Sequence, residues 1–186
     1  MYKKIFTALV LGFVLLSSGC QKEKKDEAKT EVSIKDSFEL TSIEGKKLNI
    51  KQVGGGFVLA DQEDKMVLFD IYATWCPPCR KSAAMLSSLQ DSYKDELVVI
   101  GLSIEDGISD EHIGDFAKAF RAEYFLANSQ DDKKLIATIV KSLSLAANHP
   151  IPLAVLYRGS SLINYYTGMT QEEFIRSDIK LNLEDQ

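Results

Sequence analysis

The chain is 186 residues long, with 45% hydrophobic and 26% charged residues and a net charge of −5 at neutral pH. This length suits a single domain with a proper hydrophobic core. The acidic balance argues against a nucleic-acid partner, which a basic surface would favour. The three cysteines are too few for a disulfide scaffold, so a pair among them needs another explanation.

The N-terminal segment has the three successive regions of an export signal: basic, apolar and small residues. Two lysines precede an apolar stretch over 5–16, which is too short to span a membrane comfortably, and small residues then lead to Cys20. We expect 1–19 to be a signal peptide. The sequence Ser-Ser-Gly-Cys resembles the lipobox of bacterial lipoproteins, which implies that Cys20 is lipid-modified. An ordinary secretory signal and an uncleaved anchor are the alternatives.

Residues 20–35 follow as a segment rich in Lys, Glu and Asp with almost no apolar side chains. Such a segment cannot bury a core and is expected to be a flexible tether. Without residues 1–19 the chain has 20 basic and 27 acidic side chains, a net charge of −7. The prediction is a protein outside the cytoplasm, on the periplasmic side, held to a bacterial membrane by lipid.

The remaining residues, 36–186, are expected to form one α/β domain. Alternating segments predict strands, and spacings of three and four predict helices. An apolar run over 97–104 is typical of a strand buried on both faces. In chain order we expect strands 37–41, 46–50, 57–60 and 67–72, a helix over about 77–93, strand 97–104, a helix near 113–120, strand 124–127, a helix near 135–143, strands 153–157 and 162–166, and a last helix after 170. This order implies a layered sheet whose early strands are parallel.

Two cysteines stand where the strand 67–72 turns into the next helix, in Trp-Cys-Pro-Pro-Cys at 75–79. A helix N-terminus carries unpaired N–H groups and a partial positive charge, which favour a thiolate at Cys76. Cys79 is one turn further on and can close a tight disulfide with Cys76. The pattern predicts a dithiol/disulfide redox centre. Half a zinc site is the alternative, with only His112 and His149 left as further imidazole ligands.

Asp70 is an acid in the middle of the apolar strand 67–72. Burial would disfavour its charge and raise its pKa into a range useful for proton transfer near neutral pH. The alternative is an edge strand on which Asp70 faces solvent. Because the strand is apolar on both faces, burial is the favoured interpretation.

Residues 36–183 resemble the thioredoxin superfamily, and in particular its exported TlpA/ResA-like branch. The resemblance is carried by Trp-Cys-Pro-Pro-Cys at 75–79, by Asp70 six residues before the first cysteine, by Ile151-Pro152 at the start of a strand, and by Gly168. It implies a thioredoxin fold, with a central mixed β-sheet flanked by helices. It also implies an added N-terminal β-hairpin and an insertion between the active-site helix and the strand after Pro152.

The resemblance also implies roles for individual residues. Cys76 is expected to be the exposed attacking cysteine and Cys79 the buried resolving one, with Asp70 handling the proton of Cys79. Pro152 is expected to follow a cis peptide bond. The backbone before it is expected to pair with an extended substrate strand. The substrate-binding residues implied are Trp75, Pro77, Pro78, Ile151 and Pro152.

The implied activity is a thiol:disulfide reductase for protein disulfides, including those of apocytochrome c. Electrons would come from a membrane thiol transporter. Pro77 and Pro78 lack N–H groups, which favours weaker thiolate stabilisation and a reducing centre. A disulfide oxidase or isomerase is one alternative. A copper chaperone that binds through Cys76, Cys79 and His149 is another. No cofactor is expected, and a monomer is the default.

Overall fold

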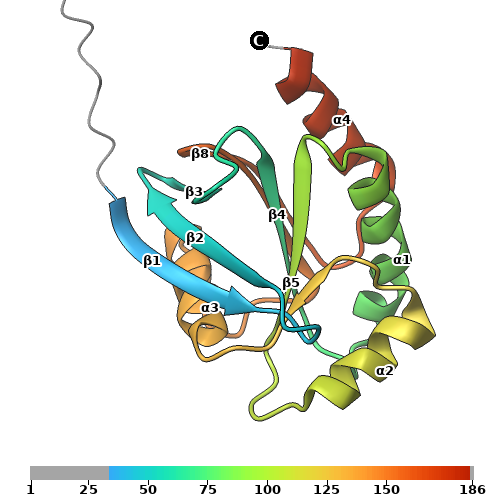
Figure 1. Ribbon diagram of the computed structural model, residues 1–186. Helices are drawn as coiled ribbons and strands as arrows, with labels where there is room; N and C mark the ends of the chain where they lie inside the picture. Colours follow the sequence, from blue (N-terminus) through green and yellow to red (C-terminus); the bar gives the residue numbers. More distant parts are fainter. Residues whose placement is uncertain (1–33, 185–186) are drawn as a thin grey trace, which may run out of the picture. The chain divides into compact units, whose positions relative to one another are not determined.

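The computed structural model describes residues 34–184 (Figure 1). The predicted signal peptide, Cys20 and nearly all of the predicted tether lie outside the described residues. Within residues 34–184, no helix combines the length and apolar character needed to cross a membrane.

The centre of the domain is a five-stranded sheet in the order β6-β5-β4-β7-β8. β4 (Met66–Tyr72), β5 (Leu97–Ser103) and β6 (Phe125–Ala127) run parallel, as predicted. β7 (Leu153–Arg158) and β8 (Ser161–Thr167) form an antiparallel hairpin, and β7 is also antiparallel to β4. β4 lies in the middle of this sheet, and every one of its residues is buried. The segment that leads to the cysteines is therefore a central, fully covered strand.

Helices cover both faces of this sheet (Figure 1). α1 (Pro77–Ser92), α2 (Asp110–Phe120) and α4 (Glu172–Glu184) contribute to cores on one face. α3 (Asp131–Ser142) packs on the other face. The predicted order of strands and helices from residue 66 onward is confirmed, since these helices bury the apolar stripes that their sequence spacing indicates.

The two faces of β4 separate its side chains by parity. Its odd-numbered residues belong to the core that is shared with α3. Leu68 packs with α1 and α4, and Tyr72 packs with α1 and α2. Because side chains alternate along a strand, Asp70 lies on the same face as Leu68 and Tyr72. That face is the one covered by α1, which carries Cys79.

A second, three-stranded antiparallel sheet is formed by β1 (Ile34–Thr41), β2 (Lys47–Val53) and β3 (Gly56–Leu59). The predicted hairpin is confirmed, and Gly45 supplies the positive φ of 79° in its turn. β3 extends the hairpin by one strand. β1 begins two residues before the expected start of the domain, because its first residue already pairs with the end of β2.

Backbone contacts fasten the small sheet to the large one. The N–H of Ile43 donates to the carbonyl of Leu126 at 3.0 Å, and that of Asn128 donates to Thr41 at 2.9 Å, so the edge of β6 is covered. Gly56 lies against the turn between β7 and β8, where an added Cβ would be only 2.5 Å from the carbonyl oxygen of Gly159. The N-terminal strands are therefore an integral layer of the domain.

Candidate active site

Cys76 and Cys79 form a disulfide at the first turn of α1, with their Cα atoms 5.3 Å apart. Cys76 is the N-cap residue, and its Sγ accepts a hydrogen bond from the N–H of Cys79 at 3.3 Å. Pro77 and Pro78 occupy the first two helical positions, where a missing N–H does not interrupt the helix. The sequence therefore predicted the place of the pair correctly.

The expectation that Cys76 is exposed is wrong for this disulfide form. Cys76 is 3% exposed, close to the 1% of Cys79. The physical reason is the loop before β7, which brings the carbonyl oxygen of Ile151 to 3.9 Å from the Sγ of Cys76. That sulfur carries no hydrogen, so this is a packing contact and not a hydrogen bond. The neighbouring Trp75 is the exposed side chain, at 59%.

The peptide bond between Ile151 and Pro152 is cis, as the resemblance implied. The carbonyl of Pro152 accepts a hydrogen bond from the N–H of Gly168 at 2.8 Å. Gly168 has a φ of 73°, a conformation that glycine adopts without steric penalty. The loop opposite the disulfide is thus tied to the end of β8.

A cavity of about 450 Å³ lies beside the disulfide loop. Its wall brings together Trp75 and Ile151, two of the predicted substrate-binding residues. Pro77 is exposed and Pro78 is half-buried at the helix start, outside this wall. The cavity residues are Trp75, Ile104, Lys133, Ile136, Ala147, Asn148, His149 and Ile151.

Asp70 is buried, with 1% of its surface exposed. Its Oδ2 accepts a hydrogen bond from the hydroxyl of Tyr124 at 2.8 Å, and its Oδ1 has no hydrogen-bond partner among the described residues. The pKa of Asp70 is raised to about 7, because the effect of desolvation exceeds the opposite effect of the Tyr124 hydrogen bond. The alternative of a solvent-facing acid on an edge strand is therefore excluded.

Sequence reasoning missed a polar network that holds the residue before Trp75. Glu105 accepts from the N–H of Thr74 at 2.6 Å and from its hydroxyl at 3.1 Å. The Thr74 oxygen also lies 3.1 Å from Nε2 of His112. Because the hydroxyl proton goes to Glu105, the imidazole is the donor to Thr74. Arg80 donates from Nε to the Thr74 carbonyl at 2.7 Å.

One sequence signal could have indicated Glu105. It follows the carboxyl end of β5, the parallel neighbour of β4, and both strands therefore deliver their next residues to the same edge of the sheet. In open α/β sheets this edge is where functional side chains gather. No comparable local signal indicates His112, because its place depends on how α2 packs.

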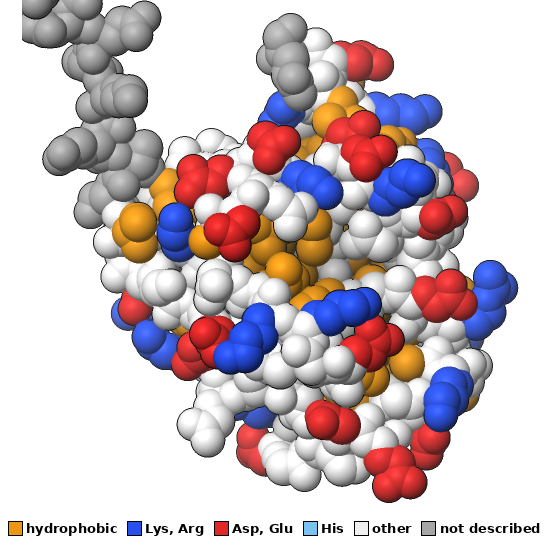
Figure 2. All heavy atoms as spheres, in the orientation of Figure 1, with side chains coloured by type: hydrophobic (Ala, Val, Ile, Leu, Met, Phe, Trp, Pro, Cys, Tyr) orange, Lys and Arg blue, Asp and Glu red, His pale blue; other side chains and the backbone are white. Residues whose placement is uncertain are grey.

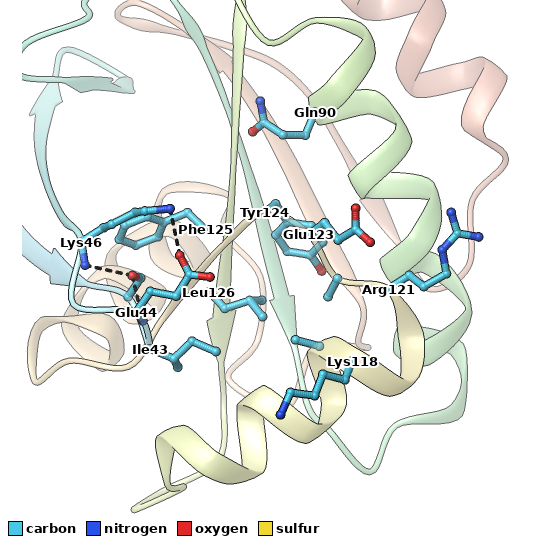
Figure 3. A pocket seen from close by; sticks show the side chains of 13 residues that line it. Ile43, Glu44, Lys46, Gln90, Lys118, Arg121, Glu123, Tyr124, Phe125 and Leu126 are labelled. Atoms are coloured by element: carbon cyan, nitrogen blue, oxygen red, sulfur yellow. Dashed lines mark hydrogen bonds and ion pairs between the residues drawn. The ribbon is translucent and has the colours of Figure 1, made fainter.

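Figure 3 shows a second cavity, of about 560 Å³, and neither Cys76 nor Cys79 is among the residues that line it. It is lined by residues of the turn between β1 and β2, of α2 and of the segment 121–126, and Tyr124 forms part of its wall. Figure 2 shows apolar side chains near the centre of a face that otherwise mixes acidic and basic groups. The larger cavity borders Tyr124, the hydrogen-bond partner of Asp70, whereas the smaller one is lined by Trp75 and Ile151, which lie next to the disulfide.

The parallel strands β4 to β6, the antiparallel hairpin β7–β8, and a disulfide at the start of α1 opposite a cis-proline define a thioredoxin-like fold. A crystal structure of a thiol:disulfide interchange protein of the thioredoxin family from Chlorobium tepidum superposes with a TM-score of 0.59 at 15% identity. It covers 83% of this chain and 98% of that one. StoA from Bacillus subtilis has a TM-score of 0.56 at 17% identity, covering 77% and 96%.

The chain belongs to the AhpC/TSA family of the thioredoxin superfamily, whose sequence profile matches residues 34–138. It is also 28% identical over 117 residues to the thiol-disulfide oxidoreductase ResA of Bacillus cereus. That match covers 63% of this chain and 60% of the relative. The expected membership of the thioredoxin superfamily, with ResA-like relatives, is confirmed.

Proposed function

We propose that this protein is an extracytoplasmic thiol:disulfide oxidoreductase that reduces protein disulfides through Cys76 and Cys79. The observation that carries the proposal is the disulfide at the N-terminus of α1, with Cys76 Sγ 3.9 Å from the carbonyl that precedes the cis-proline. The sulfur of Cys76 caps the helix and lies against the backbone of Ile151, which a substrate strand could approach. The name of the ResA relative supports the same reaction class.

The reaction begins from the reduced pair. The thiolate of Cys76 attacks one sulfur of a substrate disulfide, and the other substrate sulfur leaves as a thiolate. Cys79 then loses its proton and attacks Cys76, which closes the disulfide seen here and releases the second substrate sulfur. Two electrons pass from the protein to the substrate. A donor dithiol, which we propose belongs to a membrane thiol transporter, must return them.

We assign Asp70 as the base for the proton of Cys79. It lies on the face of β4 that α1 covers, and it is buried. Burial raises its pKa to about 7, which suits an acid–base group that works near neutral pH. Its Oδ1, which has no hydrogen-bond partner in the described part of the chain, has the capacity to accept a proton.

Substrate binding is assigned to the surface around the disulfide. The backbone at Ile151 can pair with an extended substrate segment, in the manner of an added strand. The exposed ring of Trp75 and the cavity of about 450 Å³ beside it would receive a side chain that flanks the substrate cysteine. Pro77, Pro78 and Pro152 complete the assigned surface.

The direction of electron flow follows from the helix start. The first two helical residues are prolines, and Cys79 is the first residue of α1 whose N–H reaches the Sγ of Cys76. Fewer donors stabilise a thiolate less, and a less stabilised thiolate makes a stronger reductant. We therefore favour reduction over disulfide oxidation or isomerisation.

We further propose that residues 1–19 are removed, that Cys20 carries the lipid, and that the segment up to the start of β1 tethers the domain. The basis is the order of basic, apolar and small residues before Cys20. Apocytochrome c is among the substrates that the TlpA/ResA-like resemblance implies. The proposed working unit is a monomer on the periplasmic side of a bacterial membrane.

A trapping experiment tests the roles of the two cysteines. Cys79→Ser should accumulate mixed disulfides with substrate proteins through Cys76, because attack is retained and resolution is lost. Cys76→Ser, the matched control, should trap nothing and should have no reductase activity. Identical behaviour of the two variants would refute the assignment.

The equilibrium potential of the pair, measured in thiol buffers, separates the alternative functions. A reductant should lie near the thioredoxin value of about −270 mV, whereas a strong oxidant lies near about −120 mV. Metal content assayed on the same sample tests the copper alternative. A stoichiometric copper ion that blocks disulfide formation would overturn the reductase assignment.

A further inference from the structure

A glycine on β5 leaves space next to Asp70. Gly101 is the register partner of Asp70 across the parallel pair β4–β5. A Cβ on Gly101 would lie 2.7 Å from Leu126, 3.0 Å from the ring of Tyr124 and 3.2 Å from the ring of Tyr72. Real Cβ atoms essentially never come as close to another side chain as the 2.7 Å to Leu126. The space left by the missing side chain is therefore occupied by Leu126 together with the rings of Tyr124 and Tyr72.

The Tyr124 ring that fills this space directs its hydroxyl to one oxygen of the carboxyl group. The hydroxyl donates to Oδ2 of Asp70 at 2.8 Å. Oδ1 is buried and has no hydrogen-bond partner among residues 34–184. A carboxyl group with one oxygen fixed and the other unpartnered has a defined orientation and one oxygen available for proton exchange.

We propose that Tyr124 is the positioning residue of the redox site: its hydroxyl holds Oδ2 of Asp70, so that Oδ1 is the oxygen that takes the proton of Cys79. This inference rests on the proposed role of Asp70 in thiol–disulfide exchange. Tyr124 packs against the apolar cluster that contains both cysteines, and its hydroxyl makes its hydrogen bond to Asp70. We infer that it acts on the reaction through that carboxyl group.

Among residues 34–184 few ionisable groups face Asp70, and the Tyr124 hydroxyl is the one hydrogen-bond donor to its carboxyl group. On β4 the nearest is Tyr72, whose own hydroxyl has no partner among the described residues. The cysteines of α1 are joined in the disulfide and carry no charge. β5 and β7 place Gly101 and Ala154 opposite Asp70. Burial raises the pKa of Tyr72, and the charges of Glu105 and Asp132 raise it further. Burial and the charge of Asp70 raise the pKa of Tyr124 well above its ordinary value, so its hydroxyl keeps its proton and remains a donor.

The direct test is the titration of the Asp70 carboxyl carbon by NMR in the oxidised protein, with Tyr124→Phe as the variant. Phe fills the same space without the hydroxyl. Loss of a hydrogen bond to the charged form should move the Asp70 midpoint upward by about 1 pH unit. A midpoint that is unchanged or lower in Tyr124→Phe overturns the inference.

Tyr157→Phe is the matched control. Tyr157 is fully buried, whereas Tyr124 is half-buried. Tyr157 belongs to the core shared with α3, and its hydroxyl lies 3.4 Å from Ser142. This variant should leave the Asp70 midpoint where it is in the wild type. An equal shift in the control would show that the response is not specific to Tyr124, and would also overturn the inference.

Rates of the resolving step separate this inference from the proposed function. With a midpoint one unit higher, Tyr124→Phe should be about five-fold slower at pH 7 and should approach the wild type by pH 9. If Asp70→Asn does not slow the step, the proposed role of Asp70 fails. If Asp70→Asn slows it but Tyr124→Phe matches the wild type at every pH, the inference about Tyr124 fails by itself.

A second variant, on β5, tests the hydrogen bond between Tyr124 and Asp70 in another way. In Gly101→Ala the new Cβ would press first on Leu126 and then on the ring of Tyr124. The variant should displace that ring and raise the Asp70 midpoint in the same direction, with no additional rise when it is combined with Tyr124→Phe. Additive shifts in the double variant would mean that Gly101 acts independently of the Tyr124 hydroxyl, and would contradict the packing argument.

Discussion

Replacing Asp70 by Asn should make the stability of the oxidised protein less dependent on pH. The wild type buries a carboxyl group whose pKa is raised to about 7 by desolvation. The amide of Asn has nearly the same shape, keeps an oxygen for the Tyr124 hydroxyl, and does not ionise. The variant therefore removes the titration and retains the packing.

The expected size follows from the two pKa values. A rise from 3.8 to about 7 is about 3 pH units, and each unit corresponds to 1.36 kcal/mol, which gives a destabilisation of about 4 kcal/mol once Asp70 is ionised. Between the two pKa values the folded state binds more protons than the unfolded state. Wild-type stability should therefore fall as the pH rises through this window and level off above about pH 7.

The assay is urea unfolding of the oxidised protein at pH 4.5 and pH 8.5. Relative to Asp70→Asn, the wild type should lose about 3 kcal/mol between these values. The variant should thus be the more stable of the two at pH 8.5. Asp115→Asn, which removes the charge of an exposed acid on α2, is the control and should follow the wild type. A difference between wild type and Asp70→Asn that does not change with pH would refute the reasoning.

Cys20→Ser should move the protein from the membrane fraction to the soluble fraction without changing its reductase activity in vitro; continued membrane association would mean that the segment 5–16 is itself the anchor. Tyr72→Phe should raise the free energy of unfolding by about 1 kcal/mol, because it removes a buried hydroxyl that has no partner among the described residues; a clear loss of stability in urea would show that the hydroxyl is bonded. Thr74→Val should lower that free energy by roughly 1–2 kcal/mol, because Glu105 loses a donor, and Thr74→Ser should restore most of it; equal urea midpoints for the wild type and Thr74→Val would show that the network adds nothing.

The fold was largely predictable because its elements follow from local patterns. The apolar runs at 67–72 and 97–104 indicate buried strands, and the predicted helices show apolar spacing of three and four. The place of the disulfide was predictable for the same reason, since a strand, a turn and a helix start are all local features. The burial of Asp70 also followed, because its neighbours on both sides are apolar.

The rest of the site depends on contacts that no local pattern contains. Tyr124 was expected only as part of a short strand, and its bond to Asp70 requires the open space at Gly101. A glycine within a buried apolar run is a signal of close approach, but it does not say which residue approaches. The burial of Cys76 was missed because it depends on the distant loop at Ile151.

The contacts around the disulfide join segments that are far apart along the chain. Thr74 and Glu105 are separated by 31 positions, Asp70 and Tyr124 by 54, and Cys76 and Ile151 by 75. The two cysteines, by contrast, are neighbours from the moment they are synthesised. During refolding under oxidising conditions, the bond between them can therefore form early, whereas the groups that govern its reactivity assemble only when the whole domain has closed. In an incompletely folded chain the pair, whether reduced or already joined, lacks these contacts and reacts without selectivity. A mutation that loosens the domain far from residues 76–79 should therefore degrade the selectivity of the reaction before it removes the ability to form the bond.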